Sequence, residues 1–445
     1  STEVMAGPLP SSVPDRTLCW YWQDHPRWPI DAVRQFARHT DALLAKYGRT
    51  LYQATLTDPA LQTLIADWLD SRERRLTIQA DTTDPPAVNL LALPWELLHD
   101  STGFLIQSKQ SIEFERRLPG GGDPTLPAPI PLRLLMVSPR PDTEPTGHSD
   151  HRRSALPLFE ALKNLGMLVE ARVLVPPTQT VLEKELNEAW AAGRPFTALH
   201  LDGYLRSTTT ADVPLFAFEA DPDSPTAKHR EAEFIPVPVL ASLLATYRIR
   251  LVVLTGAGPA AAALAATLLA AGIAAVITVH PNAPVDALRR FWGAFHEELL
   301  RGARISQAVF AGQRRLASDS YRAQGLGGGG VHLHDWFAIQ LYLGHQDPRL
   351  ALRPPLDLWR RLLNQRGAGS VGRLPEPPPT GFVGRGRSLL ILERLLIHHI
   401  AIFIRGPGGC GKTATAAVLA AWLMRCGRYP HIAYLRDEDA GELRT

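Results

Sequence analysis

The chain carries one complete phosphate-binding motif close to its end. Residues 406–413 spell Gly-Pro-Gly-Gly-Cys-Gly-Lys-Thr, which matches the pattern G-x-x-x-x-G-K-[ST] in full. The apolar run 400–404 before it predicts a buried strand, and the Ala-rich stretch 414–424 after it predicts a helix. Strand, glycine loop and helix in this order are what the motif requires, because backbone N–H groups at the start of the helix must face the phosphates.

The residue types of this loop predict a nucleotide cofactor, ATP or ADP with Mg²⁺. Glycines allow the backbone to approach the phosphates, the Lys412 ammonium suits the β and γ phosphates, and the Thr413 hydroxyl suits the metal. The predicted phosphate-facing glycines are Gly406, Gly408, Gly409 and Gly411.

Little sequence follows the motif. Only one more strand-like run, 431–435, precedes the last residue, Thr445. A P-loop domain also needs a later strand that ends in an acidic residue to hold the metal and position water, and no such strand fits here. We therefore expect ATP or ADP with Mg²⁺ to bind where the ATPase module is complete, and we expect no hydrolysis by this chain alone. We also expect a fragment of a longer protein, since no initiator Met is present.

Composition narrows the class of protein. Of the 445 residues 45% are hydrophobic and 20% charged, so the chain can bury a large core. A formal net charge of +3 gives no argument for a nucleic-acid or membrane partner, and we expect neither. Cys19, Cys410 and Cys426 are too few and too far apart for a disulfide framework or a zinc site, which favours a reducing, cytoplasmic setting.

Hydrophobic periodicity predicts an α/β fold with a parallel sheet covered by helices on both faces. We expect an N-terminal arm over 1–30 and then a main domain that begins at 31 with a helical pair over 31–74 and a short strand at 75–78. That domain is predicted to end near 350, with a linker over 351–380 that is Pro-rich at 375–379, and an incomplete P-loop fragment over 381–445. Within the core, 131–345, the predicted strands are 132–137, 169–174, 197–201, 251–254 and 274–278, and the predicted helices are 151–165, 178–191, 238–247, 260–271 and 285–300.

Four segments of this core carry a family resemblance. They are 93–98 (Leu-Pro-Trp-Glu-Leu-Leu) followed by 103–105, the strand ending at 200–204 (His-Leu-Asp-Gly-Tyr), the strand ending at 254–257 (Leu-Thr-Gly-Ala) and the closing run 335–342. In this order they resemble the CHAT domain, a caspase-like fold, over roughly residues 40–350, and the predicted domain is 31–350. Beyond the linker, Gly381-Phe382-Val383-Gly384-Arg385 and the phosphate loop resemble the start of a STAND-type ATPase of the NACHT or NB-ARC kind. That resemblance implies that Val383 and Arg385 lie near the adenine and ribose.

The resemblance also implies where catalytic residues would stand. Active members resemble caspases in placing a His after one strand and a Cys after the next core strand, where the thiolate attacks and the imidazole assists. In this chain those positions hold Tyr204 and Ala257, which keep the expected spacing at 53 residues apart. A methyl group cannot attack a carbonyl, and no Cys occurs anywhere between residues 20 and 409. We therefore expect a pseudo-peptidase with no catalytic residue.

Neighbouring residues offer weak substitutes. His200 matches the family's non-catalytic His and is expected in the core, and the Thr255 hydroxyl lacks a base because the residue that should supply it is a phenol. Acidic residues near the strand end are a candidate partner surface: Asp202, Asp212, Glu219 and Asp221.

The resulting hypothesis is a bacterial signalling or defence protein whose degenerate CHAT domain acts as an interaction or effector module under a nucleotide-binding STAND module. Its expected partners are a nucleotide and other proteins or copies of itself. Two alternatives stay open: an active caspase-like cysteine peptidase with a mis-registered catalytic residue, and a P-loop NTPase with an accessory domain.

Overall fold

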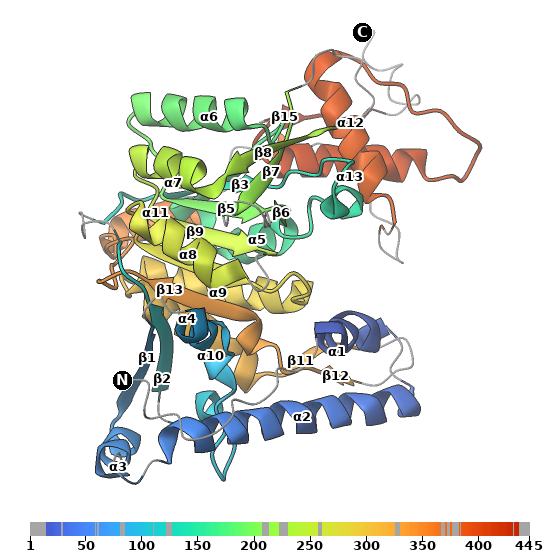
Figure 1. Cartoon of the computed structure of the whole chain (residues 1–445). Coiled ribbons are helices and arrows are strands. Elements are labelled where there is room, and N and C mark those ends of the chain that lie inside the picture. Colours follow the sequence, from blue (N-terminus) through green and yellow to red (C-terminus); the bar gives the residue numbers. More distant parts are fainter. Residues whose placement is uncertain are drawn as a thin grey trace.

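The computed structural model is built around one eight-stranded sheet (Figure 1). It describes residues 15–27, 30–57, 59, 62–80, 85–109, 111–121, 127–206, 213–221, 230–256, 260–324, 330–365, 370–371, 374–375, 382, 384–429 and 431–435. In spatial order the strands are β1 (Glu73–Gln79), β2 (Ser111–Arg117), β13 (Ile339–Leu343), β10 (Ala275–Val279), β9 (Leu251–Thr255), β5 (Ala198–Asp202), β3 (Leu132–Val137) and β4 (Val169–Val173).

The five adjacent strands β10, β9, β5, β3 and β4 are mutually parallel. Every residue of β5 and of β10 is buried, as expected of strands that carry helices on both faces. The predicted parallel core is therefore confirmed. The three remaining strands reverse direction, because β13 pairs antiparallel with β10 while β2 and β1 run parallel with β13. The alternation of strands and helices in the sequence did not predict that β13 runs antiparallel to β10.

Helices cover both faces of the sheet (Figure 1). On one face α5 (Ala155–Leu162) and α10 (Ile305–Ser318) both pack on α9 (Val285–Leu300). On the other face lie α6 (Gln179–Ala191), α7 (Val237–Thr246), α8 (Ala261–Ala270) and α4 (Pro85–Ala92). Two small sheets stand beside the main one: β6 (Leu205–Arg206), β7 (Leu215–Glu219) and β8 (Ala232–Pro236), and the hairpin β11 (Tyr321–Gln324) with β12 (Gly330–His332).

The N-terminal segment is helical and packs on the core. The predicted helical pair appears as the long helix α2 (Asp31–Leu56) and the shorter α3 (Gln62–Asp70). Before it, the described part of the arm contains α1 (Asp15–Cys19) and a turn of π-helix over 20–24. Tyr21 and Trp22 of this turn are buried, and the Trp22 indole N–H donates to the carbonyl of His334 at 3.0 Å. Among the described residues no helix is both long and apolar enough to cross a membrane.

The C-terminal segment contains α11 (Leu356–Asn364), α12 (Gly386–His398) and α13 (Lys412–Arg425). The last two helices lie at the end of the molecule opposite α2 (Figure 1). A two-residue strand, β15 (His431–Ile432), pairs parallel with β14 (Ser370–Val371) of the linker, so only the start of the predicted strand 431–435 forms. Most of the Pro-rich run 375–379 lies outside the described residues.

The strand predicted over 400–404 is wrong. These residues have no regular secondary structure, and Ile400 and Phe403 are exposed at 107% and 84%. An apolar run becomes a buried strand only where neighbouring strands satisfy its backbone and other elements cover its faces. The one strand that follows the loop in the described chain, β15, pairs with the linker instead.

Candidate functional site

The ends of β5 and β9 meet at one edge of the sheet. The strands pair in parallel, with Asp202 opposite Thr255, so the residues that follow each strand also lie side by side. A Cβ placed on Gly256 would lie 3.4 Å from the carbonyl oxygen of Gly203. The two strand ends are therefore adjacent, at the edge where parallel α/β sheets commonly place their functional residues. Ala257, the predicted nucleophile position, lies outside the described residues.

Tyr204 is the first residue after this close approach. It is half-buried, and its carbonyl accepts a hydrogen bond from the Ala217 N–H at 3.0 Å, which ties the strand end to β7. Gly203 has no room for a side chain, since an added Cβ would lie 2.6 Å from the Phe216 ring. Thr255 is half-buried at the end of β9. These backbone contacts hold the strand end rigidly, but they supply no imidazole or thiol.

His200 lies in the core instead. It is 5% exposed and its ring packs on that of Trp292 in α9, with ring centroids 4.9 Å apart. Burial, with a further contribution from the charge of His296, lowers the pKa of His200 to about 3. Burial likewise lowers the pKa of His296 to about 4. Both imidazoles are therefore neutral at neutral pH and have a packing role.

The phosphate loop leads into α13 with the local geometry that the motif predicts. Gly409 and Gly411 have positive φ angles of 74° and 84°, which favour glycine, and the helix begins at Lys412. The Lys412 ammonium donates to the carbonyls of Gly406 and Pro407 at 2.9 and 2.8 Å, inside the curve of the loop.

Other residues predicted for the nucleotide also lie near this loop. Arg385 donates a hydrogen bond from its guanidinium to the carbonyl of Cys410, so the structure brings the predicted ribose-side residue to the phosphate loop. Thr413 is exposed in the first turn of α13. Backbone N–H groups of the loop and Lys412 could hold a phosphate, and Thr413 could hold Mg²⁺. Val383 lies outside the described residues, and the strand that should precede the loop is absent.

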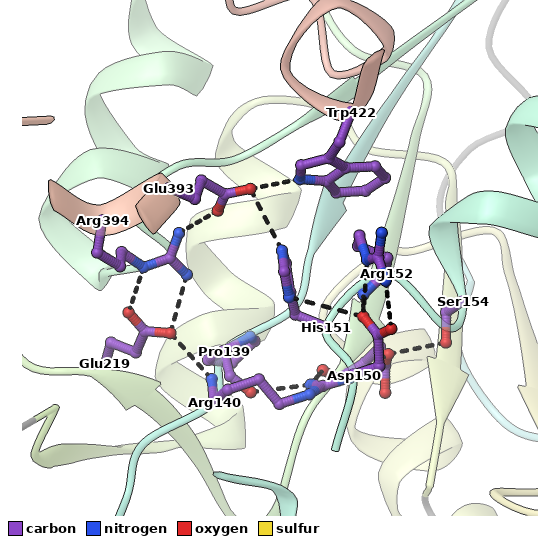
Figure 2. A network of polar contacts seen from close by, with 11 residues as sticks. Pro139, Arg140, Asp150, His151, Arg152, Ser154, Glu219, Glu393, Arg394 and Trp422 are labelled. Atoms are coloured by element: carbon purple, nitrogen blue, oxygen red, sulfur yellow. Dashed lines mark hydrogen bonds and ion pairs between the residues drawn. The ribbon is translucent and has the colours of Figure 1, made fainter. Parts of the chain in front are cut away.

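A buried ionic network joins α12 and α13 to the sheet domain (Figure 2). Arg394 of α12 donates two hydrogen bonds, at 2.9 and 3.0 Å, to Glu219 at the end of β7, and it also pairs with Glu393. Glu393, 0% exposed, accepts further hydrogen bonds from the Trp422 indole of α13 and from His151 Nε2 at 3.2 Å. One carboxylate thus receives donors from three separate parts of the chain.

The charges in this network are compensated. Burial alone would raise the pKa of Glu393, but the charge of Arg394 and the hydrogen bonds from His151 and Trp422 lower it to about 2. Burial opposes the charge of Arg394 as well, yet Glu219 and Glu393 raise its pKa above the ordinary value. Both groups are therefore charged across the physiological range, and each depends on the other because a buried charge without its partner is costly.

The network continues to the end of β5. The backbone N–H of Arg140 donates to Glu219 at 3.0 Å, and the Arg140 guanidinium donates to the Asp202 carboxylate and to its carbonyl, both at 2.6 Å. Ser154 donates to the same Asp202 carboxylate at 2.7 Å. A continuous chain of contacts therefore runs from the helix that begins at the phosphate loop to the residue just before Gly203.

The comparison with known protein families matches residues 45–348, about two thirds of the chain, to the CHAT domain. The chain belongs to the CHAT domain family. Its caspase-like character agrees with the mixed α/β fold and the mostly parallel sheet. No curated protein matches the chain.

The ionic network crosses the boundary of the CHAT match. Glu219, His151 and Arg140 belong to the matched residues, whereas Arg394 and Trp422 lie beyond them. The acidic partner surface expected around the end of β5 is wrong for Asp202 and Glu219, which are 9% and 3% exposed and satisfied internally. Asp221 is exposed, and Asp212 lies outside the described residues.

Arg140, Arg394 and Trp422 were missed by the sequence reasoning. Their role depends on pairs that are as many as 175 residues apart in the chain, as for Arg394 and Glu219. A buried Arg flanked by acidic partners has no local sequence signature, since single arginines are common on surfaces.

Proposed function

We propose that this CHAT domain is a catalytically degenerate interaction or effector module of a bacterial, cytoplasmic signalling or defence protein. The observation that carries the proposal is the junction of β5 and β9. It brings together the strand ends where the resemblance implies a His and a Cys, and the sequence there supplies Tyr204 and Ala257. Without a thiolate and an imidazole the site has no nucleophile and no base for peptide cleavage.

We propose that a nucleotide bound at the phosphate loop controls the CHAT domain. The resemblance to STAND ATPases implies that nucleotide exchange controls the module, and the loop residues fit a triphosphate through Lys412 and Thr413. Mg²⁺ held at Thr413 would neutralise phosphate charge there. The network of Arg394 and Glu393 supports this control. The helix α13 starts at the loop, and Trp422 near its end packs on the His151 ring of the CHAT domain and donates to Glu393 of α12.

Amide hydrogen exchange in the presence of Mg·ATP tests this control. ATP should slow exchange at residues 411–415, where backbone N–H groups would bind phosphate. Lys412→Ala removes a charge-assisted contact, so it should weaken the binding by about ten- to a hundredfold, on the order of 1.5–3 kcal/mol. Lys184→Ala, on the exposed face of α6, is the matched control and should change nothing. Equal exchange with and without millimolar ATP would remove the nucleotide from the proposal.

A further inference from the structure

An arginine-lined cavity of about 370 Å³ lies at the opposite edge of the sheet from the β5–β9 junction. It forms where β3, β5 and β9 begin, between the last turn of α6 and the residues that follow α7. Four arginines and two aromatic rings line it: Arg133, Arg194, Arg248, Arg250, Trp190 and Phe196. The volume falls within the range of small-molecule sites, about 300–1,000 Å³.

The positive charge of this cavity is only partly balanced. Glu170 accepts from Arg194 at 2.9 Å through both oxygens and lies 3.3 Å from the Arg133 guanidinium. Within the described part of the chain, Arg248 and Arg250 form no ion pair with any carboxylate. Glu170 pairs with Arg133 and Arg194, so the guanidinium charges of Arg248 and Arg250 have no carboxylate beside them in the described part of the cavity wall.

These two arginines come from one short connection. Arg248 and Arg250 flank the buried residue Ile249 between α7 and β9, and both line the cavity. The Nη1 atom of Arg250 is buried and has no hydrogen-bond partner. Burial, and then the charge of Arg248, lower the pKa of Arg250. Arg248 itself has a φ of 54°, in the left-handed region that favours glycine, so placing a charged side chain here has a conformational cost.

Aromatic surface lies directly beside these charges. Trp190 in the last turn of α6 is 41% exposed, and the guanidinium carbon of Arg248 lies 5.6 Å from its ring centroid. On the other wall Arg133 lies over the Phe196 ring at 4.3 Å. The cavity thus offers a planar apolar face next to two unpaired guanidinium groups.

We propose that this cavity binds a small phosphate monoester that carries a planar ring. Its phosphate accepts hydrogen bonds from Arg248 and Arg250, including the unpartnered Nη1, and its ring stacks on Trp190. A dianion balances both excess charges, and guanidinium forks match phosphate geometry well. The site belongs to the CHAT domain and is separate from the phosphate loop, so the chain has two anion sites of different construction.

Calorimetric titration of the full chain carrying Lys412→Ala, which weakens the phosphate loop, tests the proposal with three probes: AMP, ribose 5-phosphate and adenosine. AMP should bind more tightly than ribose 5-phosphate, and adenosine should not bind. Arg248→Ala and Arg250→Ala should each weaken AMP binding at least about tenfold. Trp190→Ala should weaken AMP but leave ribose 5-phosphate unchanged. Arg360→Ala, exposed on α11, is the matched control.

Three outcomes overturn the proposal: no binding of either phosphate probe at millimolar concentration, adenosine binding as tight as that of AMP, or AMP binding that survives the Arg248 and Arg250 substitutions. Arg248 is exposed, so Arg248→Ala keeps the fold and decides the question alone should Arg250→Ala fail to fold.

Discussion

Replacing Glu393 by Gln should release α12 and α13 from the CHAT domain without unfolding the sheet. The amide keeps the volume and can still accept from the Trp422 indole, but it removes the charge that faces Arg394 and His151. A pKa of about 2 in place of the ordinary 4.5 corresponds to roughly 3 kcal/mol of stabilisation of the ionised carboxylate. Arg394 lies on the same helix as Glu393 and Trp422 lies on α13, so only the contribution of His151 is lost when both helices undock, and the undocked population rises by at most about a hundredfold.

Cys426 reports this change directly. It lies just after α13, is 1% exposed, and burial raises the pKa of its thiol well above the ordinary value, so it should react slowly while α13 is docked. Maleimide labelling followed by peptide mass spectrometry should show a higher rate in Glu393→Gln, by up to about a hundredfold, provided that opening and closing are fast relative to labelling. Glu183→Gln, exposed on α6, is the control and should leave the rate unchanged.

Two results would refute this reasoning. One is an unchanged Cys426 labelling rate in a folded Glu393→Gln protein. The other is labelling that rises only together with hydrogen exchange in β5 and β9, which would mean global unfolding. The pH dependence gives a second check with a defined sign. Because the folded pKa is depressed, the Glu393 contribution is fully present above about pH 4.5 and is lost as the pH falls towards 2. Glu393→Gln should remove that part of the acid response.

Two more predictions concern the core. His200 and His296 stay neutral in the folded protein but take up protons when unfolded below their ordinary pKa of 6.5, so lowering the pH from 7 to 5 should cost about 2 kcal/mol for each. Urea unfolding at both pH values should show this loss, and replacing both residues by Leu should flatten it. Gly312→Ala should destabilise the protein by about 1–3 kcal/mol, since its Cβ would lie 2.4 Å from the Phe291 ring. The matched Gly293→Ala in α9 meets nothing within 4 Å and should stabilise by about 0.5–1 kcal/mol in the same melting experiment. A loss in both glycine variants would contradict the steric argument.

The sequence predicted those parts of the fold that depend on local periodicity. The strands around Leu199 and Val252 are mostly apolar runs between helical patterns, and right-handed crossover connections leave few ways to arrange them. The direction of β13 was not predictable in this way, because Ile339–Leu343 is an apolar run that fits a strand of either direction. The strand predicted over 400–404 does not form. The composition of this run favours a strand, but strand pairing depends on partners elsewhere in the chain.

Only part of the candidate site could be predicted from the sequence. The glycine loop and the start of α13 could be predicted because their motif is contiguous in sequence, from Gly406 to Thr413. The link from α13 through Glu393 and Arg394 to Glu219 could not, because it exists only once α12 is docked on β7. Buried ion pairs have specific partners but no spacing rule, so only the structure shows them.

Degeneracy of the CHAT site is the central claim, and cleavage of a peptide library by the full chain, with and without Mg·ATP, tests it most directly. Terminal-amine mass spectrometry should detect no time-dependent cleavage, and a thiol-directed acylating probe should label only Cys19, Cys410 and, slowly, the buried Cys426. Cleavage that accumulates with time and disappears when one residue within 197–260 is substituted would contradict the account and show an active peptidase.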